Sequence, residues 1–265
     1  MREFEYVRAA SLGEAVEAFR TSGDAVYLAG GMTLIPTLKQ RFASPARLID
    51  LSRIERLRSG VRLEGAELVV GAMTTHDAVA RSSEVARSIP ALASLAASIG
   101  DAQVRNRGTL GGALANNDPA ADYAAAALAL GATIVTDRRR IPADAFFVAL
   151  FETALECDEI IVEVSFPVAD RAGYAKFRQP ASRYALVGVM VAKTYADVRV
   201  AVCAASPCVF RAAELESALS ESFSTASIAR VPILANGLLS DAHGSSSYRA
   251  HLIGVMAARA VAAAR

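Results

Sequence analysis

The chain has 265 residues, of which 53% are hydrophobic and 21% are charged. This length and composition predict a globular protein of one to three compact units and exclude a disordered chain. Lysine and arginine together number 28 and aspartate and glutamate 27, for a formal net charge of +1. The balance gives no whole-protein attraction for nucleic acid, so we expect no nucleic-acid partner. We interpret the run Arg138-Arg139-Arg140 as a solvated turn.

The sequence shows no features of a membrane or a secreted protein. Residues 1–6 lack the apolar core of a secretory signal. The longest apolar stretch, residues 123–135, is too short to span a bilayer and predicts a buried helix that runs into a strand. The cysteines are Cys157, Cys203 and Cys208, and an odd, sparse set fits a reducing cytoplasm better than a disulfide framework. We expect a cytoplasmic protein without a metal site.

The first part of the chain predicts alternating helices and strands, which is typical of a small parallel unit. Ser11 followed by Glu14 is a capping-box pattern. Thr33 is predicted to cap a helix that tolerates Pro36 in its first turn. The expected elements are a helix from residue 11 to 20, strands over 25–29 and 47–51, and a helix over 34–41.

The middle of the chain mixes short strands with apolar helices. Gly65-Ala66 predicts a hairpin turn, and Thr74 to Asp77 predicts a short helix start. Asp118 and Pro119 predict the N-cap and first position of an alanine-rich helix. The expected elements are strands over 61–64 and 67–72, a core helix over 90–99, a helix to residue 130, and strands over 133–136 and 159–166.

A polar, turn-like segment over residues 168–173 predicts a boundary. Beyond it we expect strands over 186–192 and 198–204, a helix over 212–219, and a final helix over 248–264 that begins after Ser245-Ser246-Ser247. No internal repeat and no long linker is evident.

Two glycine pairs, Gly30-Gly31 and Gly111-Gly112, each follow an apolar segment and precede an expected helix. Glycine permits positive φ and close approach of a ligand, and successive N–H groups in such loops can hold an anion. Two loops suggest a ligand with more than one phosphate contact, such as a dinucleotide. Neither loop is a G-x-G-x-x-G or a phosphate-loop fingerprint. The first pair also fits a simple strand-to-helix turn.

The polar residues near the second glycine loop allow two interpretations. Arg105 and Arg107, in a segment expected to be extended or turning, suit a pyrophosphate or ion pairs with Asp101 or Asp118. Residues 116–118 suit sugar hydroxyls or helix capping. His76 is interpreted as a hydrogen-bonded histidine near a helix start; the alternative is a catalytic or flavin-linked role, and we assign it none. No nucleophile elbow or paired carboxylates are present, so no catalytic residue is assigned.

Four segments, in order, resemble the flavoprotein subunits of molybdenum hydroxylases, the family of the carbon monoxide dehydrogenase medium subunit and the bacterial xanthine dehydrogenase FAD subunit. They are Ala29-Gly30-Gly31-Met32-Thr33-Leu34-Ile35-Pro36, Gly71-Ala72-Met73-Thr74-Thr75-His76, Gln103-Val104-Arg105-Asn106-Arg107-Gly108-Thr109-Leu110-Gly111-Gly112, and Asp118-Pro119-Ala120-Ala121-Asp122. The resemblance extends over the whole chain and is weakest in residues 174–265.

The resemblance implies an α+β protein, with a two-subdomain FAD-binding fold of the vanillyl-alcohol oxidase-like type and a small C-terminal α/β domain. The implied domains are residues 1–170, divided at about residue 57, and residues 171–265. The implied FAD-binding residues come from the two glycine loops and five later positions. They are Leu28, Ala29, Gly30, Gly31, Met32, Thr33, Leu34, Ile35, Thr109, Leu110, Gly111, Gly112, Ala113, Asp122, Ile161, Lys176, Arg178 and Tyr184.

The resemblance assigns each of these residues a part in holding FAD. Both glycine loops would hold the diphosphate through backbone N–H groups. Thr33 and Thr109 would add hydroxyl contacts, and Asp122 would contact the cofactor. Ile161 would pack on the isoalloxazine, Lys176 and Arg178 would lie at the flavin edge, and Tyr184 would lie near the ring.

The implied function is electron transfer in an oxidoreductase complex. A partner subunit with two [2Fe–2S] clusters would deliver electrons to FAD, which passes them to an external acceptor, while a large molybdenum-cofactor subunit carries out hydroxylation. Three scattered cysteines cannot hold a cluster that needs four ligands, so the partners are required in a heterotrimer, which we expect to be doubled. The alternatives are a stand-alone FAD oxidase and an assembly or binding protein that has lost FAD.

Overall fold

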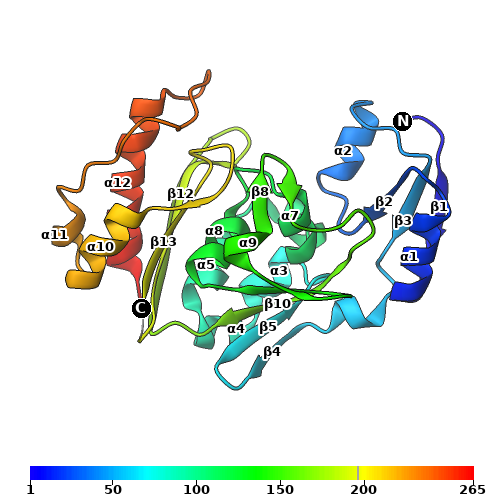
Figure 1. Cartoon of the computed structure of the whole chain (residues 1–265), viewed down its shortest axis with the longest axis horizontal. Coiled ribbons are helices and arrows are strands. Elements are labelled where there is room, and N and C mark those ends of the chain that lie inside the picture. The colour runs from blue at the N-terminus through cyan, green and yellow to red at the C-terminus, as the bar shows by residue number, and fades with distance from the viewer. Residues whose placement is uncertain (196) are drawn as a thin grey trace.

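The computed structural model describes residues 1–195 and 197–265. These residues form three sheets, each of three or more strands, which follow one another along the chain (Figure 1). The N-terminal sheet is parallel, in the order β1-β3-β2, as the alternating pattern predicts. Its elements are β1 (Glu5–Arg8), α1 (Leu12–Arg20), β2 (Ala25–Leu28), α2 (Leu34–Lys39) and β3 (Arg47–Asp50). The Ser11 side chain accepts a hydrogen bond from the Glu14 N–H, so the predicted cap is confirmed.

The central sheet is antiparallel, in the order β4-β5-β10-β6-β7. Gly65 turns the predicted hairpin with a φ of +61°. The strands are β4 (Val61–Glu64), β5 (Glu67–Gly71), β6 (Thr133–Thr136), β7 (Arg140–Pro142) and β10 (Ile161–Pro167), preceded by the 3₁₀ turn Glu55–Arg58. The helices are α3 (His76–Arg81), α4 (Ser83–Ser88), α5 (Pro90–Ala97), α6 (Ala102–Arg107), α7 (Leu110–Asn116), α8 (Asp122–Ala129) and α9 (Ala143–Phe146), and β8 (Phe147–Ala149) pairs with β9 (Glu152–Thr153).

The C-terminal sheet is an antiparallel run of sequential strands. Its elements are β11 (Arg171–Arg178), β12 (Ala185–Lys193), β13 (Val198–Cys203), β14 (Phe210–Arg211), α10 (Ala213–Glu221), α11 (Thr225–Ile228) and α12 (Ser246–Ala263). Helix α12 covers one face, and α5 and α8 lie against the other (Figure 1). Mixed helices and sheets confirm the α+β class. No helix within residues 1–195 and 197–265 is both long and apolar enough to cross a bilayer.

Helix α8 forms the junction between the central and C-terminal sheets. Every one of its eight residues is buried, and five of them are alanines. Small side chains let the helix backbone approach both neighbouring layers closely, which close packing in a protein interior requires. The apolar side chains around α8 form one continuous core that extends to Met190 and Ala201 of the C-terminal sheet. The position of α8 beside the central sheet is therefore held by its packing against the C-terminal sheet.

Two local predictions are wrong. Helix α8 begins at Asp122 and not after Asp118, because the Asp118 carboxylate accepts a hydrogen bond from the N–H of Ala120 and closes a turn before the helix. The segment that contains Arg105 and Arg107 is helix α6, whose N-cap Asp101 accepts from the Val104 N–H. The Asp101 carboxylate satisfies a free N–H group at the start of this helix. The two arginines by themselves did not indicate a helix.

Candidate functional site

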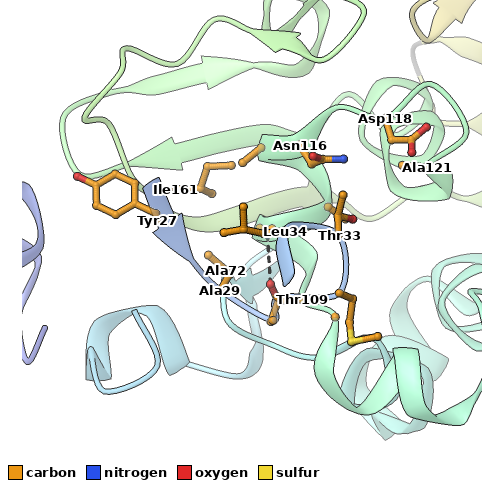
Figure 2. A pocket seen from close by; sticks show the side chains of 18 of the residues that line it. Tyr27, Ala29, Thr33, Leu34, Ala72, Thr109, Asn116, Asp118, Ala121 and Ile161 are labelled. Carbon is orange, nitrogen blue, oxygen red and sulfur yellow. Dashed lines mark hydrogen bonds between the residues drawn. The ribbon is translucent and has the colours of Figure 1, made fainter. Parts of the chain in front are cut away.

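Each of the three sheets, with the helices that cover it, forms one unit of the fold. A cavity of about 840 Å³ lies between the N-terminal and central units and extends to the loop before β12. Its volume is in the range of small-molecule and cofactor sites. Figure 2 shows Thr33 and Leu34 of the first glycine loop facing the cavity from one side and Ile161 and Asn116 from the other. Ser182, Arg183 and Tyr184 contribute a further wall from the C-terminal unit. The ligand of this cavity would therefore touch all three units.

The two glycine loops pack directly against each other. A Cβ on Gly30 would lie 2.1 Å from the carbonyl oxygen of Arg107, just before the second loop. A Cβ on Gly112 would lie 3.4 Å from the Cβ of Ala29. Only glycine allows the backbone contact at residue 30. Gly30 therefore holds the two loops together, a role different from the ligand approach that the sequence suggests.

The first loop has backbone N–H groups available for a ligand. Among the hydrogen bonds of the described residues, none uses the N–H groups of residues 30–33, and these residues line the cavity. Gly31 has a φ of +74°, the left-handed conformation that turns successive N–H groups toward one side. Gly30 and Gly31 are half-buried, whereas Met32 and Thr33 are exposed. An anionic oxygen placed here would satisfy several of these groups at once.

The second loop is braced by the segment that contains the Thr74-Thr75-His76 motif. The N–H of Leu110 donates to the Thr74 carbonyl over 3.0 Å, and the N–H of Gly111 donates to the Ala72 carbonyl over 2.9 Å. The Gly112 N–H donates to the Thr109 hydroxyl, which caps α7. Three of the N–H groups expected to hold a diphosphate thus already have partners within the chain. Thr109, Gly111, Gly112 and Ala113 still line the cavity.

His76 lies behind this second loop. Its backbone N–H donates to the Gly108 carbonyl, and a Cβ on Gly108 would lie 2.5 Å from its Nε2. The ring is 5% exposed and packs on Tyr123 with a centroid distance of 5.3 Å. Nδ1 has no hydrogen-bond partner among the described residues, so the hydrogen bond that His76 makes within them is the one from its backbone N–H. Burial, and then the charge of Arg105, lower the pKa of His76 to about 4.

The structure brings most of the predicted site residues to the cavity. Those that line it are Ala29, Gly30, Gly31, Met32, Thr33, Leu34, Thr109, Gly111, Gly112, Ala113, Asp122, Ile161 and Tyr184. Those outside the lining are Leu28, Ile35, Leu110, Lys176 and Arg178. Leu110 is buried in the core beneath its loop, and Arg178 is exposed at the end of β11. Lys176 lies behind Asp122, with Nζ 2.9 and 3.0 Å from its two carboxylate oxygens.

The charged residues beside the second loop serve the fold. The Arg105 guanidinium donates to the carbonyls of Ile99 and Gly100, and neither arginine of α6 lines the cavity. The Asn117 amide donates to the carbonyls of Ala149 and Glu152, which fastens the β8–β9 hairpin. Asn116 and Asp118, in contrast, do line the cavity, where their side chains are available to a ligand.

A further wall, residues 153–161, was largely missed from the sequence. Thr153, Leu155, Glu156, Cys157 and Glu159 line the cavity. Arg139 donates to both oxygens of Glu159, and this ion pair, with further donors, lowers the pKa of that carboxyl to about 2 against the opposing effect of burial. Arg138, Arg139 and Arg140 are all exposed, as the expected solvated turn requires, and the Arg139 side chain also forms this ion pair. Alternating apolar residues indicated strand β10, but no distinctive sequence pattern indicated the β8–β9 hairpin and the residues after it that complete this wall.

The fold and the cavity indicate a protein that binds a cofactor-sized ligand between its units. Residues 2–169 match the family model described as the FAD binding domain in molybdopterin dehydrogenase. The carbon monoxide dehydrogenase medium chain of Hydrogenophaga pseudoflava is 37% identical, over 98% of this chain and 96% of the relative. The nicotine 6-hydroxylase medium subunit of Paenarthrobacter nicotinovorans is 35% identical, over 94% and 92%. A solved structure of the Hydrogenophaga pseudoflava carbon monoxide dehydrogenase superposes with a TM-score of 0.90 at 37% identity, covering 99% of this chain and 97% of that one.

The chain belongs to this family of FAD-binding domains in molybdopterin dehydrogenases. It is an FAD-binding subunit of a molybdenum hydroxylase-type dehydrogenase, and FAD is its cofactor. The observed site fits FAD on physical grounds, because a cofactor-sized cavity meets an anion-binding row of N–H groups at residues 30–33. The resemblance stated from four motifs is thereby confirmed.

Proposed function

We propose that the chain transfers electrons within a molybdenum hydroxylase complex, from [2Fe–2S] clusters of a partner subunit through FAD to an external acceptor. The observation that carries the proposal is the cavity, which joins an anion-binding glycine loop to an apolar wall around Ile161. FAD bound here supplies the redox chemistry, and the protein supplies binding and orientation. The glycine loop at residues 30–33 would hold the diphosphate.

The three cysteines of the chain support a role that depends on partner subunits. Cys157 is exposed, Cys203 is buried, and Cys208 is intermediate, so the three thiols occupy different environments. A [2Fe–2S] cluster needs four ligands. The relatives named above are medium subunits, a term that implies smaller and larger companions. We propose an iron–sulfur small subunit and a molybdenum-cofactor large subunit, in a heterotrimer that is doubled, in the cytoplasm.

The site residues and domains remain proposals of the same kind. We propose that Ile161 packs on the isoalloxazine and Tyr184 lies near it, since both line the cavity from opposite units. We propose a division at about residue 170, where β10 ends and the C-terminal sheet begins. The Asp122 carboxylate, at the first turn of α8, would accept a hydrogen bond from the cofactor.

The test begins with an absorbance spectrum of the purified chain, repeated on the supernatant after heat denaturation. We expect a flavin spectrum and release of free FAD. Copurification from the native source should then bring down iron and molybdenum proteins. A colourless chain that takes up no added FAD would refute the proposal. A yellow chain that turns over substrate alone, without iron or molybdenum, would replace it with a stand-alone oxidase.

A further inference from the structure

A buried polar cluster joins the cofactor cavity to the C-terminal sheet. Asp122 lines the cavity from α8, while Tyr174 and Lys176 project from alternate positions of β11 toward it. The Tyr174 hydroxyl donates to Oδ1 of Asp122, and Lys176 Nζ donates to both carboxylate oxygens, over 2.9 and 3.0 Å. The Lys176 side chain is 3% exposed and that of Asp122 6% exposed. Such a pair persists in an interior only when its hydrogen bonds are well made.

The space around the Tyr174 hydroxyl is limited by a glycine. A Cβ on Gly188 would lie 2.6 Å from the Tyr174 hydroxyl and 2.7 Å from the Cys203 sulfur. Burial, reinforced by the charge of Asp122, raises the pKa of Tyr174 well above its usual value. The same two causes raise the pKa of Cys203 to about 12. Both groups therefore stay protonated, and the tyrosine remains a hydrogen-bond donor.

The hydrogen bonds leave Asp122, which lines the cavity, with one accepting position free among the described residues. Each carboxylate oxygen can accept about two hydrogen bonds. Oδ1 receives bonds from Tyr174 and Lys176, whereas Oδ2 receives a bond from Lys176 alone among the described residues. An ionised carboxylate accepts but does not donate. The ligand group that it fits is a hydrogen-bond donor, such as a hydroxyl of a sugar or ribityl chain or the N–H of a flavin ring.

We propose that Tyr174 and Lys176 are positioning residues, which hold the Asp122 carboxylate so that the C-terminal sheet completes the FAD site. Lys176 then acts through Asp122 and not through contact at the flavin edge. This inference rests on the proposed function only in that FAD is the ligand of the cavity. It explains why two polar side chains of β11 are buried against α8, a helix otherwise rich in alanine.

A double-mutant cycle on the full-length chain tests the inference. FAD is removed, and the apoprotein is titrated with FAD by quenching of flavin fluorescence. Tyr174→Phe removes one donor and keeps the ring, and we expect about tenfold weaker FAD binding, a loss of the size that a hydrogen bond to a charged group supplies. Lys176→Met should weaken binding at least as much. In an Asp122→Asn background, Tyr174→Phe should change affinity by less than about twofold.

A matched control is available at the other end of the molecule. The Tyr6 hydroxyl donates to Oδ2 of Asp50, which lies outside the cavity lining, so Tyr6→Phe deletes the same kind of bond without altering FAD affinity. Unchanged affinity in Tyr174→Phe would overturn the inference, as would a full tenfold effect that persists in the Asp122→Asn background. Failure of the wild-type apoprotein to bind FAD would overturn the proposed function as well. The wild-type titration therefore distinguishes failure of the proposed function from failure of the positioning role alone.

Discussion

His76 shows how a motif residue can serve the fold and carry no assigned chemistry. Its imidazole fills the space behind Gly108 and packs at a tilt of 49° on the Tyr123 ring, and its Nδ1 and the Tyr123 hydroxyl both lack partners among the described residues. The cost of burying an imidazolium there is what lowers the pKa of His76 to about 4. The neutral ring is therefore part of the native packing.

The lowered pKa predicts a loss of stability in mild acid. Between pH 6.5 and 4 the unfolded chain binds a proton at His76 that the folded chain does not, so the free energy of unfolding falls by about 1.4 kcal/mol per pH unit in that window. Urea titrations from pH 7 to 4.5 measure this slope. His76→Gln should flatten it and leave FAD bound and reducible. An unchanged slope in the variant would assign the acid sensitivity to other groups.

At the scale of elements, the sequence predicted each glycine loop but not their contact. Helix caps and hairpin turns depend on residues a few positions apart, which is why Ser11 and Gly65 were assigned correctly. The contact of Gly30 with Arg107 joins segments more than 70 positions apart, and no local pattern encodes it. Lys176 was assigned by motif to the flavin edge, and its ion pair with Asp122 became visible only when β11 was placed against α8.

The packed loops predict that their glycines are needed before any ligand arrives. Gly30→Ala should lower the free energy of unfolding by about 3 kcal/mol and yield apoprotein, because its Cβ would meet the Arg107 carbonyl at 2.1 Å. Gly111→Val should act similarly, since its Cβ would lie 2.6 Å from that of Ala72. Denaturant unfolding together with FAD content measures both effects.

A glycine in open surroundings provides the control for these substitutions. Gly13 lies within α1, and a Cβ there would meet its nearest neighbour, the Ser11 hydroxyl, at 4.0 Å. Gly13→Ala should stabilise the chain by up to about 1 kcal/mol, because alanine is the better helix former. If Gly30→Ala lost FAD without losing stability, the glycine would instead be required for direct approach of the ligand.

For the whole molecule, the cavity is the place where the three units meet. The first glycine loop, the Asp122 end of α8 and the loop that carries Tyr184 contribute to one lining. The N-terminal core also includes Ile160, which directly precedes β10, and Val162 of β10, and the central core extends into the C-terminal sheet. Shared cores make the units fold together, so a ligand that touches all of them acts on a single transition.

FAD should therefore raise the melting temperature of the whole chain in one step. A ligand at one hundred times its Kd stabilises the native state by about 2.7 kcal/mol, which for a chain of this size is a shift of about 5–10 °C. Scanning calorimetry of the apoprotein with and without added FAD measures the shift. Two transitions of which only one moves would show that one unit unfolds independently and that the cavity is not a shared site. Because Tyr174 and Lys176 join the C-terminal sheet to Asp122, Tyr174→Phe should reduce the FAD-induced shift, while Tyr6→Phe should preserve it.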